Sequence, residues 1–479
     1  MTRVIAGPFN RVEGDLEVAL DIQDGVIARA EVTTTLYRGF EAILSGRPPS
    51  DALVIAPRIC GICSVSQSIA AASALRNLAG GRAAPNGYLA ANLAHAAENI
   101  ADHLTHFYLF FMPDFARAEY AGRAWFDATA ERFRAVSGHA SAEYLPARRR
   151  LLEIMGLIAG KWPHSLAFQP GGVTKAIDIG ERVRLAAILA DFQAFLEQTL
   201  YGVSLDDILS MQTEADLEAM RAKSSGDFSA FLDIVEDLAL RNLGRGPGLL
   251  LSYGAYHEAD TSLFPAGIAG LGGVTPFDGS RISEDVAFSW FSDTADTPFE
   301  AETMPDAFKN GAYSWAKAPR IDGQPMETGA AARLTVAGHP LIAELIARDG
   351  GTSVRTRVIA RLVETAILVH SMQGWLRQLR LKDAFSTHFA LPDDARAAGL
   401  VEAARGALGH WVTLTNGKIE RYQIIAPTTW NFSPRDRTGL PGPLEQALEG
   451  VETGALGAKS AALQHVIRSF DPCMVCTAH

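Results

Sequence analysis

The four cysteines of this 479-residue chain form two Cys-x-x-Cys pairs, Cys60 with Cys63 and Cys473 with Cys476. The pairs lie near opposite ends of the sequence and include every thiol in it. Two intervening residues allow one turn of backbone to direct both sulfurs at a single ion. If folding joins the two pairs, four thiolates meet at one centre, and the fold itself builds a metal site.

Two other interpretations of these cysteines are open on spacing alone. Disulfides suit small secreted domains, and a chain of this length with four cysteines has little need of them. A structural zinc site with four cysteine ligands is a stronger alternative, although zinc ribbons place their pairs roughly 15 to 20 residues apart. Thiolates also bind iron–sulfur clusters, nickel and copper(I), so ligand softness does not identify the metal.

The residues that flank the two pairs are more specific. The first pair lies in the segment RICGIC (58–63) and the second in DPCMVCTAH (471–479). Together these segments resemble the two cysteine signatures of nickel–iron (NiFe) hydrogenase large subunits. The resemblance implies a Ni-Fe centre whose iron carries carbon monoxide and cyanide (CO and CN) ligands. By motif, Cys60 and Cys473 correspond to the terminal nickel ligands, and Cys63 and Cys476 to the ligands that bridge nickel and iron.

Further blocks of the family pattern occur in the family's order along the chain. They read RVEG (11–14), RGFE (38–41), HFY (106–108), PH (163–164), GGV (171–173), ME (326–327), RGALGHW (405–411) and PTTWN (427–431). The segment from about 205 to 320 is the part least similar to the family.

Hydrogen is a poor acid, and its heterolytic cleavage needs a Lewis-acidic metal for the hydride and a nearby base for the proton. The resemblance assigns the sulfur of Cys473 as the first proton acceptor and Glu13 as the residue that relays the proton onward. A single glutamate in an N-terminal turn is ordinarily solvated, so this role for Glu13 depends on the match of the RVEG block.

Arg405 resembles the arginine that lies over the open coordination position and contacts a cyanide ligand. A planar guanidinium with a fixed charge suits an anionic diatomic ligand better than a mobile lysine does. Thr429 resembles the hydroxyl residue that binds the second cyanide, and Asp114 and Asp471 resemble carboxylates that position Arg405. Without the family match, these residues are expected to be ordinary surface pairs or a turn cap.

A second metal is implied by the same resemblance. Glu41, the backbone carbonyl of Ile424 and the terminal His479 correspond to ligands of a magnesium ion (Mg2+) that ties the C-terminus to the core. The alternative for Glu41 is a plain surface carboxylate. His103 and His106 lie three residues apart on one predicted helix, and we interpret them as core residues that form hydrogen bonds rather than as metal ligands.

Three positions depart from the usual catalytic pattern of the family. Gln67 stands four residues after the first pair, where most members have a histidine that donates to a bridging sulfur. An amide can still donate but does not titrate near neutral pH. Ile62 and Phe110 stand where oxygen-sensitive members have the smaller Val and Leu, at the inner end of the gas channel.

These departures, and an end of the chain at His479 without the usual C-terminal extension, resemble the regulatory members of the family. The sequence therefore predicts a hydrogen-sensing NiFe hydrogenase large subunit that cleaves H2 slowly and signals to a partner such as a sensor histidine kinase. The alternative is an energy-conserving uptake hydrogenase, and outside the family a structural four-cysteine zinc protein. Ala404, where many relatives have proline, has no interpretation.

Composition restricts the partners and the location. The formal net charge of −11 argues against nucleic acid or an anionic membrane as the main partner. The start of the sequence lacks a signal peptide pattern, and the most apolar stretches are interrupted by charges such as Arg361 and Glu364. We expect a cytoplasmic protein without a membrane span.

An electron-carrying partner is also predicted. Oxidation of H2 releases two electrons, and with all four cysteines committed to one site no thiolates remain for an iron–sulfur cluster in this chain. The resemblance implies that the iron–sulfur clusters reside in a smaller subunit, which packs against this one through an extensive interface.

The elements that must position these residues are mainly helices. Alternating residues over 16–22 and 26–32, joined by Asp24-Gly25, predict a β-hairpin in a β-rich segment 1–36. Apolar residues three and four apart predict helices from 66 to Gly80 and over 88–111, 142–159, 181–200 and 353–381. We expect one α+β domain over 1–479, mainly α with small β elements around a helical bundle: helical over 60–260, irregular over 261–340, and helical over 353–479 with the C-terminal metal motif. The metal site lies between the N- and C-terminal motifs.

Overall fold

The N-terminal residues form a three-stranded antiparallel sheet in this computed structural model, which describes residues 2–258, 261–292 and 297–477. The predicted hairpin is confirmed as β2 (Leu16–Gln23) and β3 (Val26–Thr34), and β1 (Thr2–Ala6) adds a third strand on the open edge of β2. The hairpin forms because Leu16, Val18 and Leu20 alternate toward the core and are fully buried.

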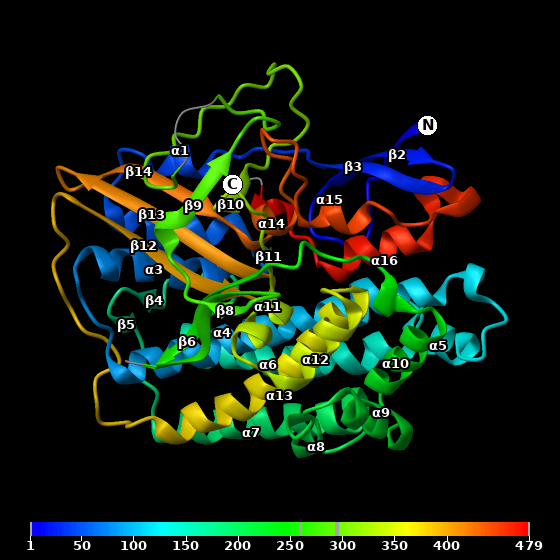
Figure 1. The fold of residues 1–479 in the computed structure, drawn as a ribbon. Coiled ribbons are helices and arrows are strands. Elements are labelled where there is room, and N and C mark those ends of the chain that lie inside the picture. Colours follow the sequence, from blue (N-terminus) through cyan, green and yellow to red (C-terminus); the bar gives the residue numbers. More distant parts are fainter. Residues whose placement is uncertain (1, 259–260, 293–296, 478–479) are drawn as a thin grey trace.

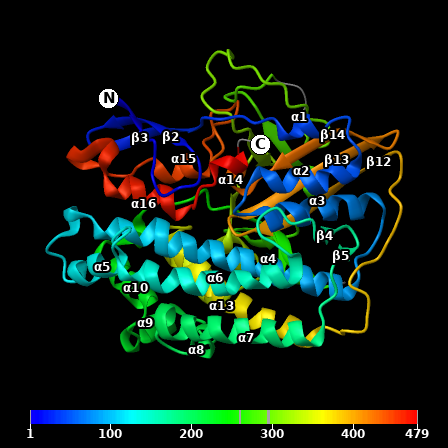
Figure 2. The ribbon, with the colours of Figure 1, turned by 180° about the vertical axis from the view of Figure 1, so that it is seen from behind.

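Four long helices make the bundle that the sequence predicts. They are α4 (Pro85–Thr105), α6 (His139–Ala159), α7 (Ile179–Phe195) and α13 (Val354–Gln378). Helices α4 and α7 each pack against both α6 and α13, and the four lie side by side in the lower half of Figure 1 and again in Figure 2. Two of them continue as π-helical segments, α4 through His106–Phe111 and α7 through Leu196–Tyr201.

Shorter helices lie around the bundle and the sheets. They are α1 (Phe40–Leu44), α2 (Ala52–Ile55), α3 (Ser64–Leu78), α5 (Phe126–Phe133), α8 (Leu205–Leu209), α9 (Glu214–Lys223), α10 (Asp227–Asp237), α11 (Ala330–Val336) and α12 (Pro340–Asp349). The predicted helix that ends at Gly80 corresponds to α3, which begins directly after Cys63.

The region after the bundle is not helical throughout, which corrects the prediction for 353–479. Residues 395–425 form an antiparallel sheet of β12 (Ala395–Ala403), β13 (Gly406–Thr415) and β14 (Lys418–Ile425). Helix α3 packs against β12 and β13 on one face. Most of β13 is buried on both faces, so its sequence lacks the alternation by which strands are recognised.

The segments predicted as helical over 60–260 and as irregular over 261–340 both contain strands, which corrects these two predictions. A long hairpin of β6 (Leu250–Glu258) and β7 (Thr261–Gly270) carries β8 (Gly273–Thr275) on one edge and β11 (Glu327–Thr328) on the other. The remaining strands are short: β9 (Ile282–Asp285) pairs with β10 (Ala318–Ile321), and β4 (Phe168–Gln169) with β5 (Gly172–Val173).

The two ends of the chain lie together. Helices α14 (Pro427–Asn431), α15 (Pro443–Leu448), α16 (Ala461–Ser469) and α17 (Met474–Thr477) follow the sheet, and α15 packs against β3 of the N-terminal sheet. Figure 2 shows this red C-terminal part beside the blue N-terminal sheet. The prediction of a mainly helical α+β fold is confirmed.

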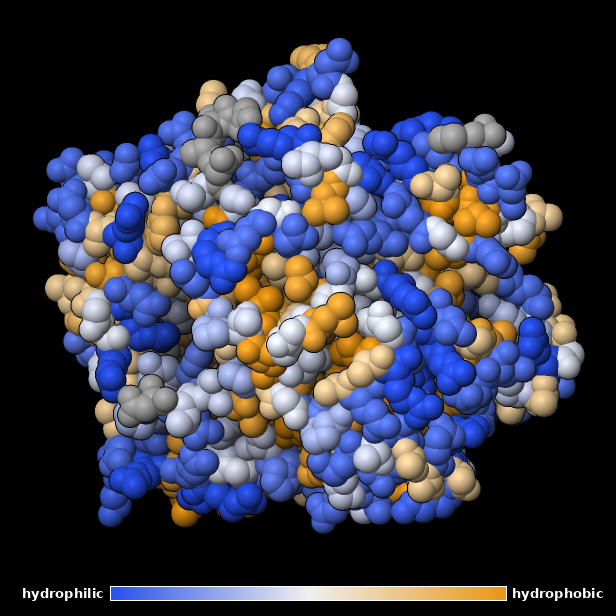
Figure 3. All heavy atoms as spheres, viewed as in Figure 1, coloured by the Kyte–Doolittle hydropathy of each residue, from blue (hydrophilic) through white to orange (hydrophobic). Residues whose placement is uncertain are grey.

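The surface seen in Figure 3 mixes hydrophilic and hydrophobic residues, with hydrophobic atoms gathered across its middle. None of the described helices is both long and apolar enough to span a bilayer.

Candidate metal centre

The four cysteine sulfurs converge, as the sequence predicts. The sulfur of Cys60 lies 3.5 Å from that of Cys473, Cys63 lies 3.2 Å from Cys476, and Cys473 lies 3.2 Å from Cys476. All four residues are buried and none forms a disulfide. Hydrogen bonds among the four thiols lower the pKa of Cys60 and raise the pKa values of Cys63 and Cys476, so the first proton to leave the cluster comes from Cys60. Four converging buried sulfurs are the arrangement that binds a soft metal.

The first pair lies in the loop before α3. Cys63 is the N-cap residue of that helix, and the backbone N–H of Ile62 points at the sulfur of Cys60 at 3.3 Å. Arg38, from the RGFE block, donates to the carbonyl oxygens of Ile59 at 2.5 Å and of Val475. One guanidinium thus holds together the residues adjacent to both cysteine pairs.

The second pair is held by the N-terminal RVEG block and by α14. The backbone of Glu13 accepts from Met474 N–H at 2.7 Å and donates to the carbonyl of Pro472 at 3.3 Å. Gly14 has a φ of +81°, and a β-carbon there would approach Met474 Cβ to 3.1 Å, so both conformation and space require glycine. The hydroxyl of Thr428 accepts from Cys473 N–H at 3.1 Å.

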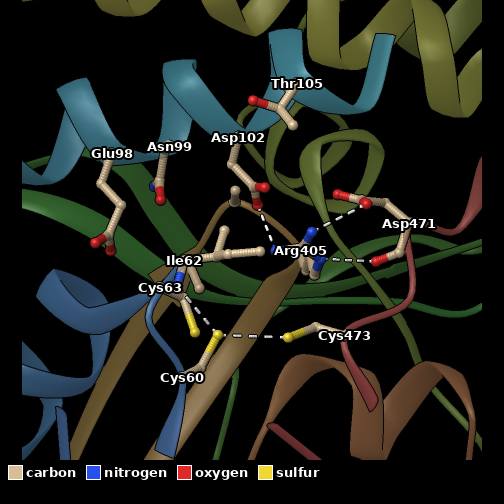
Figure 4. Close-up of polar contacts among 12 residues, drawn as sticks. Cys60, Ile62, Cys63, Glu98, Asn99, Asp102, Thr105, Arg405, Asp471 and Cys473 are labelled. Atoms are coloured by element: carbon tan, nitrogen blue, oxygen red, sulfur yellow. Dashed lines mark hydrogen bonds and ion pairs between the residues drawn. The ribbon is translucent and has the colours of Figure 1, made fainter. Parts of the chain in front are cut away.

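Arg405 is buried beside the cysteines and is fixed by two carboxylates, as Figure 4 shows. Its Nη1 donates to Asp102 Oδ2 at 2.5 Å, its Nη2 to Asp471 Oδ1 at 3.1 Å, and its Nε to the Asp471 carbonyl at 2.8 Å. Asp471 has a φ of +56°, a left-handed conformation that aspartate tolerates better than most residues. The predicted contact between Arg405 and Asp471 is present.

Burial and neighbouring charges shift the pKa values of Arg405 and its two aspartates in different directions. Burial opposes ionisation of Asp471, but Arg405 together with His106 and Arg361 outweighs it and holds the pKa of Asp471 below its ordinary value. Burial raises the pKa of Asp102 to about 8 against the effect of Arg405, with Asp471 adding to the rise. The pKa of Arg405 is raised well above its usual value, because the carboxylates outweigh its desolvation. Asp471 is therefore the permanent counter-charge of Arg405.

The structure corrects the expected contact of Asp114. Its carboxylate binds Arg11, Arg117 at 3.0 Å and Arg468 at 2.7 Å, with His465 at 3.6 Å. Burial opposes its ionisation, yet these partners together lower its pKa far below the ordinary value. Asp114 ties the N-terminal loop to α16, and Asp102 takes the position at Arg405 that the sequence assigned to Asp114.

The sequence pattern points to Asp114 and not to Asp102, because Asp114 follows the HFY block of the family pattern. A signal was available, since a stripe of buried polar residues at spacings of three and four runs along α4 and into the π-helical segment that follows it. The stripe consists of His95, Glu98, Asn99, Asp102, His103 and His106. Buried polar residues in such a row must have partners from elsewhere in the fold.

Glu98 is a second buried carboxylate that the sequence analysis did not single out. It accepts from the backbone N–H groups of Val65 at 2.9 Å and Ser66 at 3.0 Å, and from the indole of Trp162 at 2.9 Å. Burial raises its pKa to about 7 despite these donors. Glu98 therefore caps the helix that begins at the first cysteine pair, which has no side-chain cap of its own.

Glu13 is half-buried next to the cysteines. Burial raises its pKa, and the neighbouring Cys60 raises it further while Arg405 opposes the rise. A carboxylate whose pKa is raised toward neutrality is better suited to accept and release protons than one at its ordinary value.

The buried polar atoms at the site that have no protein partner among the described residues include two donors, the hydroxyl of Thr429 and the amide nitrogen of Gln67. Buried donors of this kind are rarely left unsatisfied in a native protein. Their presence beside four converging thiols fits an inorganic group that accepts hydrogen bonds, as metal-bound cyanide and metal thiolates do.

The two bulky residues predicted for the gas channel come from different segments of the fold. Ile62 is half-buried, and Figure 4 shows its side chain extending from the cysteine loop toward Arg405. Phe110 is also half-buried and lies on the π-helical segment after α4.

The predicted magnesium ligands Glu41 and Ile424 are adjacent, while His479 lies outside the described residues. Glu41 is buried and accepts from the Ile424 N–H at 2.9 Å, and its second oxygen binds Thr303. Lys317 Nζ lies 3.6 Å from the same carboxylate. Oxygen donors in a buried cluster suit a hard cation such as Mg2+.

His103 and His106 form core hydrogen bonds, as predicted. His103 Nε2 contacts Glu364 at 3.0 Å, and His106 Nε2 contacts the Arg468 carbonyl at 2.6 Å.

Comparison with known proteins gives a family match over nearly the whole chain. A family model described as nickel-dependent hydrogenase matches residues 38–145 and 139–479. Among solved structures, the reduced Ni-Fe-Se hydrogenase from D. vulgaris Hildenborough superposes with a TM-score of 0.85 at 29% identity and covers 100% of both chains.

Named relatives also match this chain over its full length. The periplasmic NiFeSe hydrogenase large subunit of Desulfomicrobium baculatum is 29% identical over 100% of this chain and 95% of its own. The uptake hydrogenase large subunit of Azotobacter chroococcum mcd 1 is 27% identical over 100% of this chain and 95% of its own. A family match of this extent, in a chain whose four cysteines converge, shows that the protein is a hydrogenase and belongs to the nickel-dependent hydrogenase family, among its large subunits.

Proposed function

We propose that this chain cleaves H2 heterolytically at a Ni-Fe centre held by Cys60, Cys63, Cys473 and Cys476, with CO and CN ligands on the iron. The convergence of the four sulfurs is the observation that carries the proposal. When bound, such a centre supplies the Lewis acidity that H2 cleavage needs and a thiolate as the adjacent base.

The surrounding residues have separate tasks in this proposal. Cys473 holds the first proton on its sulfur, and Glu13 accepts it for transfer away from the site. Arg405 keeps a fixed positive charge over the site, oriented by Asp102 and Asp471. The hydroxyl of Thr429 and the guanidinium of Arg405 supply the hydrogen bonds for the cyanides.

The same proposal includes a magnesium ion at Glu41, the carbonyl of Ile424 and His479, and a smaller partner that carries the iron–sulfur clusters. The relatives are named large subunits or large chains, which implies a smaller companion in each of them. In this chain every cysteine belongs to one site, so electrons from H2 must leave through a partner.

We further propose that the protein is a cytoplasmic H2 sensor that reports to a signalling partner such as a histidine kinase. Gln67 supports this role, because an amide next to the first cysteine pair does not change its charge between pH 5 and 8 as a histidine does. The bulky Ile62 and Phe110 support it as well, since a sensor that works in air needs restricted access of oxygen.

An uptake hydrogenase is the second candidate, and the likeness to the A. chroococcum uptake subunit favours it. Deletion of the gene separates the two. A sensor is expected to be required for H2-dependent induction of other hydrogenases, with growth on H2 otherwise intact when those enzymes are expressed constitutively. Loss of growth on H2 under constitutive expression would instead identify an uptake enzyme.

Metal analysis combined with infrared spectroscopy tests the centre itself. The purified complex is expected to contain one nickel per chain and to show absorption bands of CO and CN. Zinc without nickel, and a spectrum without these bands, would contradict the proposal and support a structural zinc site.

A further inference from the structure

The amide of Gln67 is held on one side only. It is fully buried in the first turn of α3, and its Oε1 lies 2.8 Å from His410 Nε2. Its Nε2 has no hydrogen-bond partner among the residues that the structure describes. The side chain is therefore fixed through its acceptor, while its two donor hydrogens remain available.

Gln67 is close in the helix to the first cysteine pair. Its backbone N–H binds the carbonyl of Cys63 at 3.0 Å, so the two residues lie one helical turn apart on the same face. Long side chains on a helix lean back toward its N-terminus, which here is Cys63 itself. The sulfurs of Cys63 and Cys476, which are 3.2 Å apart, are acceptors on that side.

His410 is in turn bound to Tyr422. The two are diagonal neighbours on β13 and β14, where His410 pairs with Ile424, and His410 Nδ1 lies 2.7 Å from the Tyr422 hydroxyl. All members of this row are buried. Burial raises the pKa of Tyr422, so its phenol keeps its proton and can donate.

The hydrogen bonds that join Tyr422, His410 and Gln67 can all form in only one direction of donation. If Tyr422 donates to Nδ1, then Nε2 of the neutral imidazole carries the proton and donates to the Gln67 carbonyl oxygen. The amide NH2 must then face away from His410. In the reverse direction the Gln67 oxygen would face the cysteine sulfurs, which repel it, and the phenol proton would need another acceptor.

We propose that His410 and Tyr422 are positioning residues that lock the Gln67 amide with its NH2 group toward the Cys63 and Cys476 sulfurs. This inference rests on the proposed Ni-Fe centre and deepens it. Hydrogen bonds from such a donor draw electron density from a metal thiolate, so outer residues tune the metal through the ligand. In this chain a strand-borne histidine sets the orientation of a helix-borne amide.

Infrared spectra of the intact complex test the lock, because the stretching frequency of iron-bound CO falls as the thiolates become more electron-rich. Gln67→Leu removes the donor and is expected to lower the CO frequency. His410→Phe releases the amide and should shift the band in the same direction. Tyr422→Phe should do so more weakly, since the imidazole can then adopt either tautomer. Tyr201→Phe is the matched control: it also deletes one buried tyrosine hydroxyl, which donates to the Leu362 carbonyl at 2.7 Å.

A double variant separates positioning from a general structural effect. If His410 acts through Gln67, His410→Phe adds no shift in a Gln67→Leu background. An unchanged CO band in His410→Phe, or an equal shift in both backgrounds, would overturn the inference. If His410→Phe fails to load metal, Tyr422→Phe in the two backgrounds answers the same question by the same criterion.

The infrared spectra distinguish failure of the proposed Ni-Fe centre from failure of the lock. Wild-type complex without CO and CN bands would overturn the proposed centre and the lock with it. Normal bands in the wild type that do not respond to the variants would overturn the lock alone.

Discussion

Arg405 shows how one buried residue can depend on carboxylates from two distant parts of the chain. Asp102 comes from the middle of α4, and Asp471 comes from the turn before the second cysteine pair. Burial of a guanidinium costs free energy unless carboxylates pair with it, and loss of one carboxylate leaves part of the guanidinium without a partner. The orientation of Arg405 over the site therefore depends on Asp102 as well as on Asp471.

The first prediction compares two buried aspartates. Asp102→Ala leaves Arg405 Nη1 without its partner, so the guanidinium is expected to turn and H2-dependent dye reduction to fall about 100-fold. Asp114→Ala is the control, because Asp114 binds Arg11 and Arg468 instead. The control should lose roughly 3 to 5 kcal/mol of stability but keep the turnover of its folded fraction. Equal turnover losses in both variants would contradict the assignment.

The second prediction concerns pH. Burial raises the pKa of Asp102 to about 8, so the carboxyl is neutral below that pH and charged above it. Asp102→Asn keeps an oxygen that can accept from Arg405 but has no charge at any pH. Turnover of the Asn variant is therefore expected to follow the wild type below about pH 8 and to diverge above it. Parallel profiles from pH 6 to 9 would show that ionisation of Asp102 has no role.

The third prediction concerns oxygen. Ile62→Val with Phe110→Leu removes bulk where the sequence predicts the inner end of the gas channel, so H2-dependent activity in air should decay faster than in the wild type. The Ile62→Val single variant is expected to carry most of the effect, because Ile62 extends toward Arg405. Oxygen resistance that is unchanged in the double variant would contradict this function of the two side chains.

The residues of the site were partly predictable. The cysteines could be found because a metal constrains both residue type and spacing, and Arg405 and Asp471 lie close to motif residues. The choice between Asp102 and Asp114 could not be made from sequence. The polar stripe along α4 indicates that Asp102 needs a buried partner, but which carboxylate reaches Arg405 is decided by the packing of α4 against strands far away in the chain.

At the level of elements, α3 is built to present the first cysteine pair but begins without a side-chain cap of its own. Its neighbour α4 supplies Glu98, which accepts from two backbone N–H groups of the first turn. The cap is therefore a tertiary contact, so the conformation at Cys63 depends on how α3 and α4 pack.

The fourth prediction tests this cap. Glu98→Ala leaves two helix N–H groups and the Trp162 indole without their acceptor, at about 1 to 3 kcal/mol each. In metal-free protein at pH 8, where Glu98 is ionised, the start of α3 should open more often, and thiol labelling of Cys63 should accelerate about 100-fold. Glu181→Ala, which removes the capping box of α7, is the control and should leave the labelling rate of Cys63 unchanged. Equal rates in the two variants would show that Glu98 does not hold this turn.

Helices were more predictable than sheets, for a physical reason. In α4 and α13 the apolar residues recur every three or four positions over many turns, so the pattern is long enough to recognise. Strand β12 is rich in Ala, and most of β13 is buried on both faces, so neither shows a clear alternation of apolar and polar residues. They are strands because β12, β13 and β14 pair with one another, and α3 and β6 pack against them.

For the whole molecule, the metal site is the place where the two ends of the chain are joined. Glu13 exchanges backbone hydrogen bonds with Pro472 and Met474. Arg468 of α16 donates to the carbonyl of Asn10 at 2.8 Å and binds Asp114 at 2.7 Å. A metal bound to all four cysteines adds a further link between the same segments, so its binding energy should stabilise both ends together.

The fifth prediction follows from this link and is measured by hydrogen exchange. Protein produced without nickel is expected to lose amide protection in residues 11–14 and 470–477 together, by about 100-fold or more, because a ligand at 100 times its Kd stabilises the bound state by about 2.7 kcal/mol. Amides in the middle of α6 and α7 lie in the bundle, away from the cysteines, and should exchange at the same rate in both forms. If only 470–477 lost protection, the Glu13 backbone bonds would not depend on the metal site. If protection fell throughout the bundle as well, the metal would be needed for the global fold and not specifically for the junction of the two ends.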